Sequence, residues 1–275
     1  MLAALLREGT ARLAAAGVED AARDSRLLLA FAAGIAADRL TLHLGEPAAH
    51  GVAERFEAAV AARAGRRPLA QVTGERLFWG RSFAVTRDTL DPRPETEVLV
   101  AAALSAPFGR VLDLGTGTGC ILLSLLADRP GTTGLGVDVS TAALEVARAN
   151  ARRHGLQDRA ALAVSDWFAE VDGCFDLVVT NPPYIPEAEL EGLQPEVRDW
   201  EPRGALTPGG DGLGAYRAIA AGAARHLQPG GRLLAEIGPT QAGAVAALFR
   251  AGGLDVTAVL PDLDGRDRVV VARRP

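Results

Sequence analysis

Four consecutive residues, Asn181-Pro182-Pro183-Tyr184, have side chains and carbonyl groups that can hold a planar nitrogen group, and they directly follow an apolar run at 175–179. The Asn181 side-chain carbonyl and the Pro182 backbone carbonyl can each accept one N–H of a single NH2 group. An amide nitrogen shares its lone pair with its carbonyl, so two such acceptors would orient it and make it more electron-rich. Tyr184 can pack against the flat group, and the prolines stiffen the loop. We therefore predict catalytic roles for Asn181, Pro182 and Tyr184, and acceptor binding by all four residues.

A glycine-rich segment that follows another apolar stretch, from Arg110 to Leu114, has the composition of a cofactor loop. A turn of this kind lets the backbone approach a nucleotide-like cofactor closely. Together with the Asn-Pro-Pro-Tyr motif, it suggests methyl transfer from a sulfonium donor to a planar nitrogen. The residues expected to contact the cofactor here are Gly115, Thr116, Gly117, Thr118 and Gly119.

Further cofactor contacts are expected at the ends of the next two strands. Asp138 lies 19 positions after Gly119, where a carboxylate can accept hydrogen bonds from both hydroxyls of a ribose. Asp166 and Trp167 follow the next strand, and there Asp166 can accept from an adenine amine while Trp167 packs on the ring. Asn181 is expected to contact the cofactor as well. Asp113 can either support the glycine turn or lie near the sulfonium.

Each motif also has a plain structural interpretation. Asn-Pro often ends a strand with an Asx turn, although such a turn does not need a second proline and a tyrosine. A Gly-x-Gly-x-Gly turn also serves dinucleotide enzymes, or simply joins a strand to a helix. An Asp beside a Trp is often a helix cap at the edge of the core.

Several kinds of chemistry are disfavoured by the composition. The chain of 275 residues has no lysine among its 29 basic residues, which excludes a Schiff base and a Gly-Lys-Ser/Thr phosphate loop. The four histidines and two cysteines, Cys120 and Cys174, show no metal-ligand spacing, so no metal is expected. A net charge of -5 argues against a protein that coats nucleic acid through a surface that neutralises phosphates.

The N-terminal third is expected to be a folded helical region and not a targeting segment. Residues 1–33 are rich in Ala, Leu and Arg, but acidic residues interrupt them at helical spacing, whereas transit peptides are poor in acids. Apolar residues recur every three or four positions up to about Ala64, which predicts a small helical bundle. Since no apolar run reaches the roughly 18 residues of a membrane span, we expect a soluble, cytoplasmic protein without membrane partners.

The composition changes at 68–97, where Gly, Thr, Arg and aromatic residues replace the helical spacing of apolar residues. Two short strands flanking Gly80-Arg81 suggest a hairpin with a two-residue turn. Pro92 and Pro94 delay any helix until about Glu95. This stretch is expected to bridge two lobes.

From Arg110 onward, strands and helices alternate, which predicts a mostly parallel, doubly wound sheet. The link at 261–267 is too short for a crossover helix, so the last two strands should form an antiparallel hairpin. We expect strands at 110–114, 134–139, 160–164, 175–180, 232–237, 255–260 and 268–272, and helices at 118–127, 140–154, 213–226 and 240–251.

The chain resembles release-factor glutamine methyltransferases of the PrmC/HemK type over nearly its whole length, in motif order and spacing. The resemblance implies a Rossmann-like, class I S-adenosylmethionine-dependent fold with a seven-stranded sheet and a C-terminal antiparallel hairpin. It departs at Asp91, where the family usually has an aliphatic residue, and this affects local packing more than chemistry. The similar segments are 71–74, 78–79, 92–97, 113–119, 165–168, 181–184, 201–206 and 209–213.

The resemblance also implies a substrate, a cofactor and a division of labour. The acceptor would be the glutamine side-chain amide in the Gly-Gly-Gln loop of class I peptide chain release factors, with S-adenosyl-L-methionine converted to S-adenosyl-L-homocysteine. Residues 1–67 would bind the partner protein, 68–97 would form the bridge, and 98–275 would carry out the transfer. We expect a monomer without direct nucleic-acid contacts.

Two other functions stay open at this point. An adenine-N6 DNA methyltransferase could hold an exocyclic amine with the same carbonyl pair, but it would need a basic cleft and a target-reading domain. A non-catalytic module that binds S-adenosylmethionine or a nucleotide would have little reason to keep both carbonyl acceptors and Tyr184.

Overall fold

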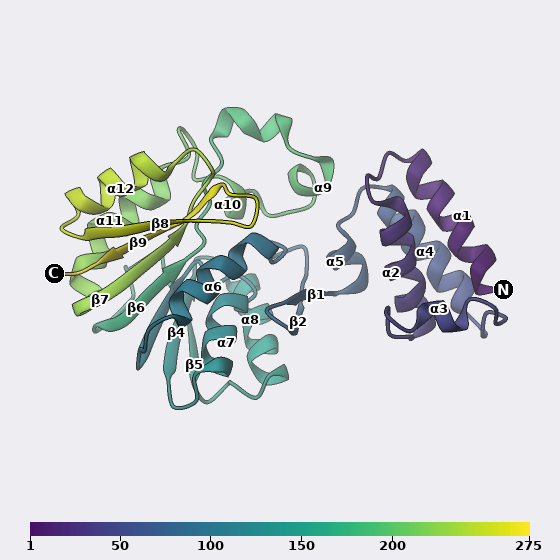
Figure 1. Ribbon diagram of the computed structural model, residues 1–275, viewed down its shortest axis with the longest axis horizontal. Helices are drawn as coiled ribbons and strands as arrows, with labels where there is room; N and C mark the ends of the chain where they lie inside the picture. Colours follow the sequence, from purple (N-terminus) through teal and green to yellow (C-terminus); the bar gives the residue numbers. More distant parts are fainter. The chain divides into compact units, whose positions relative to one another are not determined.

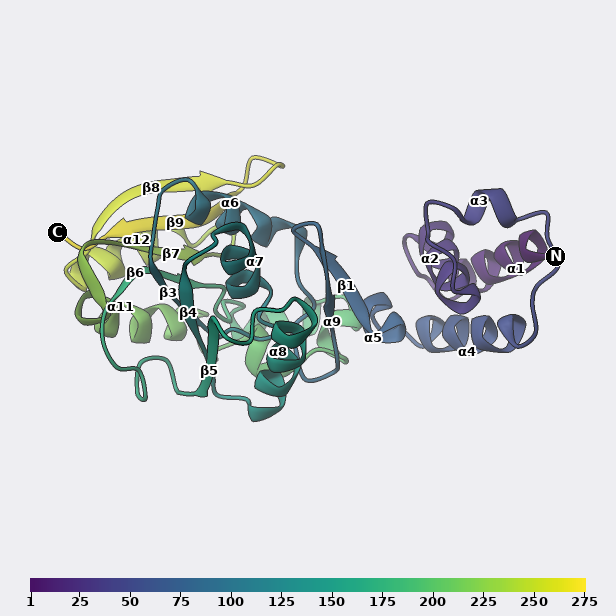
Figure 2. The same cartoon turned by 90° about the horizontal axis from the view of Figure 1, so that it is seen from below.

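The computed structural model describes residues 1–275, and the chain divides into two compact units. The helical unit comprises Met1–Glu75 and Gln194–Trp200. The sheet unit comprises Arg76–Leu193 and Glu201–Pro275. Figures 1 and 2 show the fold of each unit from two directions.

The helical unit is a small bundle, as the spacing of apolar residues predicts. Its core contains fully buried leucines from three helices, among them Leu13, Leu28 and Leu40, together with Phe56. The second helix ends at Gly34, whose φ of 67° is the left-handed conformation that glycine adopts readily. The helices are α1 (Leu2–Ala15), α2 (Ala21–Ala33), α3 (Leu40–His43), α4 (Val52–Ala64) and α5 (Leu69–Thr73).

A segment from much later in the chain completes the helical unit, which the sequence pattern did not indicate. It contains α9 (Pro195–Arg198), whose Glu196 accepts hydrogen bonds from Arg63 Nη1 at 2.9 Å and from Arg66 Nη2 at 2.6 Å. Arg63 also donates through Nε to Asp24 Oδ2 at 2.7 Å. Burial acts to raise the pKa of Glu196, but the bonds from Arg66 and Arg63 outweigh it and hold this pKa below its usual value.

The predicted hairpin is present, but its turn lies one residue earlier than expected. Strands β1 (Glu75–Phe78) and β2 (Arg81–Ala84) flank Trp79-Gly80, not Gly80-Arg81. Both turn residues have positive φ, 50° and 68°, as a type I′ turn requires. Trp79 tolerates this conformation because its backbone N–H donates to Glu97 Oε1 at 2.7 Å and its indole N–H to Asp128 at 2.6 Å.

The sheet unit contains the predicted seven-stranded, mostly parallel sheet. Its strand order is β5-β4-β3-β6-β7-β9-β8, and only β9 runs antiparallel to both of its neighbours. The strands are β3 (Arg110–Leu114), β4 (Thr133–Asp138), β5 (Ala160–Val164), β6 (Phe175–Thr180), β7 (Leu227–Glu236), β8 (Asp255–Pro261) and β9 (Asp267–Arg273). The strand β7 begins five residues earlier than predicted, at a register irregularity beside Phe175.

Helices cover both faces of the sheet, and each face has its own apolar cluster. One cluster includes residues of α6 (Glu97–Leu104), α7 (Cys120–Asp128) and α8 (Thr141–Arg153); the other includes residues of α11 (Gly214–His226) and α12 (Ala242–Ala251). Four helices of the sheet unit were not predicted from the sequence: α6 and the short η1 (Pro94–Thr96), η2 (Glu187–Gly192) and α10 (Arg203–Leu206).

No helix of the chain has the length and apolar character that crossing a membrane requires.

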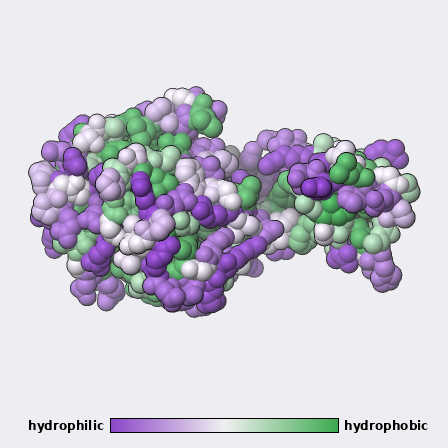
Figure 3. All heavy atoms as spheres, turned by 60° about the horizontal axis from the view of Figure 1, so that its bottom comes forward, coloured by the Kyte–Doolittle hydropathy of each residue, from purple (hydrophilic) through white to green (hydrophobic).

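On the face drawn in Figure 3, hydrophobic residues lie interspersed among hydrophilic ones on both units.

The strand order places the predicted motifs together. Because β3 pairs with both β4 and β6, the direction of winding reverses beside β3, and ligands of open α/β sheets bind at the carboxyl ends of strands around such a point. The glycine loop, Asp138, the Asp166 segment and Asn181 all lie at these strand ends.

Candidate active site

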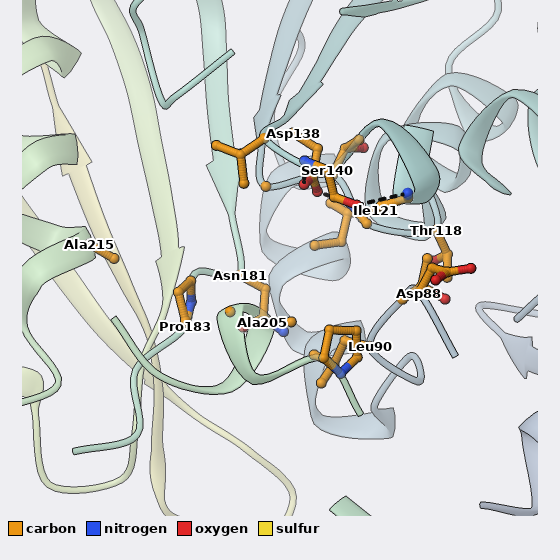
Figure 4. Close-up of a pocket in the computed structure, with 18 of the residues that line it drawn as sticks. Asp88, Leu90, Thr118, Ile121, Asp138, Ser140, Asn181, Pro183, Ala205 and Ala215 are labelled. Atoms are coloured by element: carbon orange, nitrogen blue, oxygen red, sulfur yellow. Dashed lines mark hydrogen bonds between the residues drawn. The ribbon is translucent and has the colours of Figure 1, made fainter. Parts of the chain in front are cut away.

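A cavity of about 570 Å³ lies within the sheet unit at the carboxyl edge of its parallel strands. Figure 4 shows Asp138 and Ser140 on one side of it and Asn181 and Pro183 on another. Three predicted site residues, Gly119, Pro182 and Tyr184, are not among the residues that line it. The predicted residues that do line it are Gly115, Thr116, Gly117, Thr118, Asp138, Asp166, Trp167, Asn181 and Pro183.

The three glycines of the loop differ in what surrounds them, although all have positive φ. A Cβ added at Gly115 or Gly117 would meet no heavy atom within 4 Å, so the backbone there borders open space. A Cβ at Gly119 would lie 3.1 Å from Leu123 Cδ1, because this residue packs where α7 begins. Gly115 and Gly117 can therefore face a ligand, whereas Gly119 allows close packing of the helix.

Asp138 holds the loop in place as well as facing the cavity. Its Oδ2 accepts a hydrogen bond from the Gly117 backbone N–H at 3.0 Å, and its Oδ1 accepts from Ser140 N–H at 2.9 Å. Ser140 in turn caps α8, since its hydroxyl oxygen accepts from Ala143 N–H at 3.1 Å. Each carboxylate oxygen retains lone-pair capacity for a further donor, such as a ribose hydroxyl.

Asp113 supports the loop from beneath. It is fully buried, does not line the cavity, and accepts a hydrogen bond from the Thr116 hydroxyl at 2.7 Å. Burial raises the pKa of Asp113 to about 7. Of the two roles considered from the sequence, the geometry favours loop support.

The segment after β5 presents a carboxylate and an indole to the cavity. Asp166 is exposed, and Trp167 is half-buried against the apolar cluster of α11 and α12, with a φ of 51°. Ser165 fixes this turn, because its hydroxyl donates to Trp167 O at 2.9 Å and accepts from Glu170 N–H at 3.0 Å.

Asn181 lies at the end of β6 with its amide oriented by a neighbour. Its Nδ2 donates to Thr96 Oγ1 at 3.2 Å, which leaves Oδ1 available as an acceptor beside the cavity. The preceding Thr180 is fully buried and donates its hydroxyl to Leu114 O at 2.8 Å, which ties β6 to β3. The Pro182 carbonyl accepts no backbone hydrogen bond in the loop.

Tyr184 packs mainly against other residues of the protein, whereas the sequence predicted that its ring contacts the acceptor group. Its ring packs against the apolar cluster of α11 and α12, and burial raises its pKa to about 12. Its carbonyl accepts from Gln241 Nε2 at 2.9 Å, while Gln241 Oε1 accepts from Gly238 N–H at 3.0 Å. Tyr184 therefore fixes the motif to the loop that follows β7.

A second set of lining residues was not predicted as a site. Many come from the bridge and from the segments around α10, where the only sequence signal was the family-like motifs at 92–97 and 201–206; the others lie at the starts of α7, α8 and α11 and after β4 and β5. They are Asp88, Thr89, Leu90, Pro92, Arg93, Thr96, Cys120, Ile121, Val139, Ser140, Ala143, Ser165, Pro202, Gly204, Ala205, Thr207, Pro208, Gly214 and Ala215.

These two motifs are joined by an ion pair. Arg93 Nη2 lies 2.8 and 2.7 Å from the two carboxylate oxygens of Glu201, which is buried. Asp91, the position that departs from the family pattern, is buried nearby with Arg76 Nε at 3.8 Å, and burial raises its pKa. Arg76 and Arg93 therefore offset only part of the cost of burying this acid, whose Oδ1 has no hydrogen-bond partner; Asp91 itself does not line the cavity.

No group of three or more His, Cys, Asp or Glu side chains is arranged to hold a metal ion anywhere in the chain. The polar groups that line the cavity include carboxylates, hydroxyls, the Trp167 indole and the Asn181 amide.

Comparison with known proteins gives the family. Residues 4–74 match the PrmC N-terminal domain and residues 84–194 match the Methyltransferase small domain. The release factor glutamine methyltransferase of Cereibacter sphaeroides is 62% identical over 98% of this chain and 97% of its own length. The chain belongs to the release factor glutamine methyltransferase family.

Other members of this family are also similar over nearly full length. The release factor glutamine methyltransferase of Rhodospirillum rubrum is 47% identical over 100% of this chain and 85% of its own. Among solved structures, a methyltransferase from Pyrococcus furiosus aligns with a TM-score of 0.55 and 16% identity, over 79% of this chain and 97% of its own. That likeness supports the methyltransferase fold of the sheet unit.

Proposed function

We propose that this enzyme transfers the methyl group of S-adenosyl-L-methionine to the side-chain amide nitrogen of the glutamine in the Gly-Gly-Gln loop of class I peptide chain release factors. The observation that carries the proposal is the orientation of Asn181. With Nδ2 bound to Thr96, its Oδ1 is left as a hydrogen-bond acceptor in the same cavity as the glycine loop.

The residues of the cavity suit the proposed cofactor. Open space beside Gly115 and Gly117 gives a ligand access to the backbone, and Asp138 has acceptor capacity for ribose hydroxyls. Asp166 and Trp167 would accept from the adenine amine and pack on its ring. We propose that these residues, together with Thr116, Thr118 and Asn181, hold the cofactor, and that Gly119 contributes through the packing of α7.

Asn181 and Pro182 would hold the acceptor amide. Asn181 Oδ1 and the Pro182 carbonyl each accept one N–H, so the nitrogen is oriented and its lone pair is directed toward the donor. Pro183 and Tyr184 keep this loop rigid, and Tyr184 is anchored through Gln241. When bound, the cofactor supplies an electrophilic methyl group on a positively charged sulfonium. This methyl group would pass from sulfur to the acceptor nitrogen, with S-adenosyl-L-homocysteine as the neutral leaving group and the nitrogen proton released to water.

The helical unit is proposed to bind the release factor. Its sequence matches the PrmC N-terminal domain, and its own buried core lets it present a stable surface. We assign partner binding to residues 1–67, a bridge to 68–97 and transfer to 98–275. The enzyme is proposed to act as a cytoplasmic monomer.

The family assignment favours this function over adenine-N6 DNA methylation and over a non-catalytic binding module. A net charge of -5 likewise disfavours a nucleic-acid substrate, because binding the phosphate backbone depends on neutralising cations.

A methyl-transfer assay with labelled S-adenosylmethionine tests the proposal. A purified bacterial release factor should become labelled, and the same factor with its Gly-Gly-Gln loop changed to Gly-Gly-Ala should not. Label on neither factor, but on duplex or single-stranded DNA, would replace the proposal with the adenine alternative.

A further inference from the structure

Glu236 is a buried carboxylate that the proposed mechanism does not yet use. It is the last residue of β7, is 1% exposed and forms no ion pair. The two arginines that influence it are bound elsewhere: Arg268 donates to Asp262 at 2.9 and 3.2 Å, and Arg93 pairs with Glu201. Burial raises the pKa of Glu236 to about 7. An unpaired buried acid is costly for folding, which favours a functional reason for its presence.

Neighbouring polar side chains connect this carboxylate to the proposed acceptor site. The Thr96 side chain, which is 2% exposed, lies close enough to Glu236 to favour its charged form, while Glu236 Oε2 has no hydrogen-bond partner. Thr96 Oγ1 accepts from Asn181 Nδ2 at 3.2 Å. Thr96 and Asn181 line the cavity, whereas Glu236 lies behind them.

The orientation of these side chains depends on which groups can donate. With a pKa of about 7, Glu236 is ionised above that pH and can then only accept, so the single proton of the neighbouring Thr96 hydroxyl turns toward it. The Thr96 oxygen is then an acceptor, and only the NH2 end of the Asn181 amide satisfies it. The carbonyl end of that amide must consequently face the cavity, which is the orientation that an acceptor NH2 group requires.

We propose that Thr96 and Glu236 are positioning residues that fix the orientation of the Asn181 side-chain amide for methyl transfer. The proposal rests on the proposed function of Asn181. It assigns no contact with substrate or cofactor to Glu236, and it requires the hydroxyl of Thr96 rather than its size.

The orientation can be observed without turnover, because Asn150 and Asn181 are the only asparagines in the chain. Protein grown with ¹⁵N-labelled asparagine should give two side-chain NH2 signals, assigned by Asn181→Ala. Asn150 serves as an internal control, since it is fully buried and its Nδ2 donates to Thr118 O at 2.9 Å and Ala84 O at 3.1 Å. Thr96→Val should shift the Asn181 signal and speed its proton exchange while leaving the Asn150 signal unchanged. An unaltered Asn181 signal would overturn the proposal.

Kinetics with a release factor give the second readout. Thr96→Val, which keeps the shape but lacks the hydroxyl, should lower kcat by about 10- to 100-fold because the amide is no longer oriented. The cofactor Kd and the release-factor KM should stay within about threefold, since neither ligand loses a direct contact. Thr96→Ser should recover most of the activity. A kcat for Thr96→Val that matches the wild type would contradict the positioning role.

Glu236→Gln tests the member of this set that does not line the cavity. A glutamine can present either an acceptor or a donor to Thr96, so kcat should fall by about tenfold and the Asn181 signal should shift or broaden. A purely structural Glu236 would instead change the melting temperature and leave kcat and the signal unaltered. If the wild-type enzyme itself labels no release factor, the proposed function fails, whereas the NMR result still decides whether Thr96 and Glu236 orient Asn181.

Discussion

The carboxylate of Asp138 lies 3.0 Å from the backbone nitrogen of Gly117, so a residue expected to bind the ribose also holds the glycine loop. Its other oxygen accepts from Ser140 N–H at the start of α8. One side chain at the end of β4 thus connects the loop after β3 to the helix after β4. Changes at Asp138 should consequently affect both the cofactor and the loop.

Asp138→Ala should weaken S-adenosylmethionine binding by about 1–3 kcal/mol, because ribose hydroxyls and Gly117 N–H both lose an acceptor. Asp138→Asn, which keeps one oxygen, should lose less. Isothermal titration calorimetry measures both affinities. Unchanged affinity in the alanine variant would remove Asp138 from the cofactor site.

Asn181→Ala should abolish methyl transfer while leaving cofactor affinity within a few-fold, because its proposed work is on the acceptor amide. The assay is transfer of labelled methyl to a release factor, alongside calorimetric titration of the cofactor. A large loss of cofactor binding would show that Asn181 acts chiefly on the cofactor.

Gly115→Ala and Gly119→Ala should differ in their effect on the cofactor. Both glycines have positive φ, so each alanine should lower the free energy of unfolding by about 1–2 kcal/mol through backbone strain. A methyl group at Gly115 borders the cavity and should also weaken cofactor binding, whereas one at Gly119 lies 3.1 Å from Leu123 Cδ1 and should cost about 1–3 kcal/mol more in packing. Titration and urea unfolding separate the two effects, and a selective loss of cofactor affinity at Gly119 would contradict the packing role.

Glu236→Gln should change how stability depends on pH. The pKa of Glu236 is raised from 4.5 to about 7 in the fold, so the folded protein binds more protons than the unfolded chain between these values. The free energy of unfolding of the wild type therefore falls as pH rises through this window. The variant lacks this loss, so its stability relative to the wild type should increase by up to about 3 kcal/mol from pH 4.5 to above 7. Urea unfolding at a series of pH values checks this, and a difference independent of pH would refute it.

Glu196→Gln should destabilise the helical unit by about 1–2 kcal/mol at neutral pH, because its contacts with the buried Arg63 and the partly buried Arg66 are weakened. The pKa of Glu196 is lowered, so its contribution is present above the pKa of the unfolded chain and is lost as pH falls through the folded value. The matched control is Glu57→Gln, since Glu57 is 60% exposed and its pair with Arg12 is screened by water. Equal losses in both variants would argue against a special role for α9.

The sequence by itself determined the strands and the longer helices around the sheet, and the place of the main motifs. The alternation of strand and helix patterns predicted the parallel sheet, and the short 261–267 link predicted the antiparallel end. Asp138, Asp166 and Asn181 could be brought together because carboxyl ends of parallel strands meet at one edge. These inferences depend on the periodicity of apolar residues and on turn-forming residues, and both are visible in residues that are close together in the sequence.

The tertiary structure decided which distant side chains meet. Thr96 and Asn181 are 85 positions apart, and Glu236 lies 55 positions further on, so only the pairing of β6 with β7 and the course of the bridge bring them together. The same holds for Glu196, which joins the helical unit from much later in the chain, and for the conformation of Trp79, which Glu97 supports. Such contacts depend on sheet order and register, and no local pattern in the sequence specifies them.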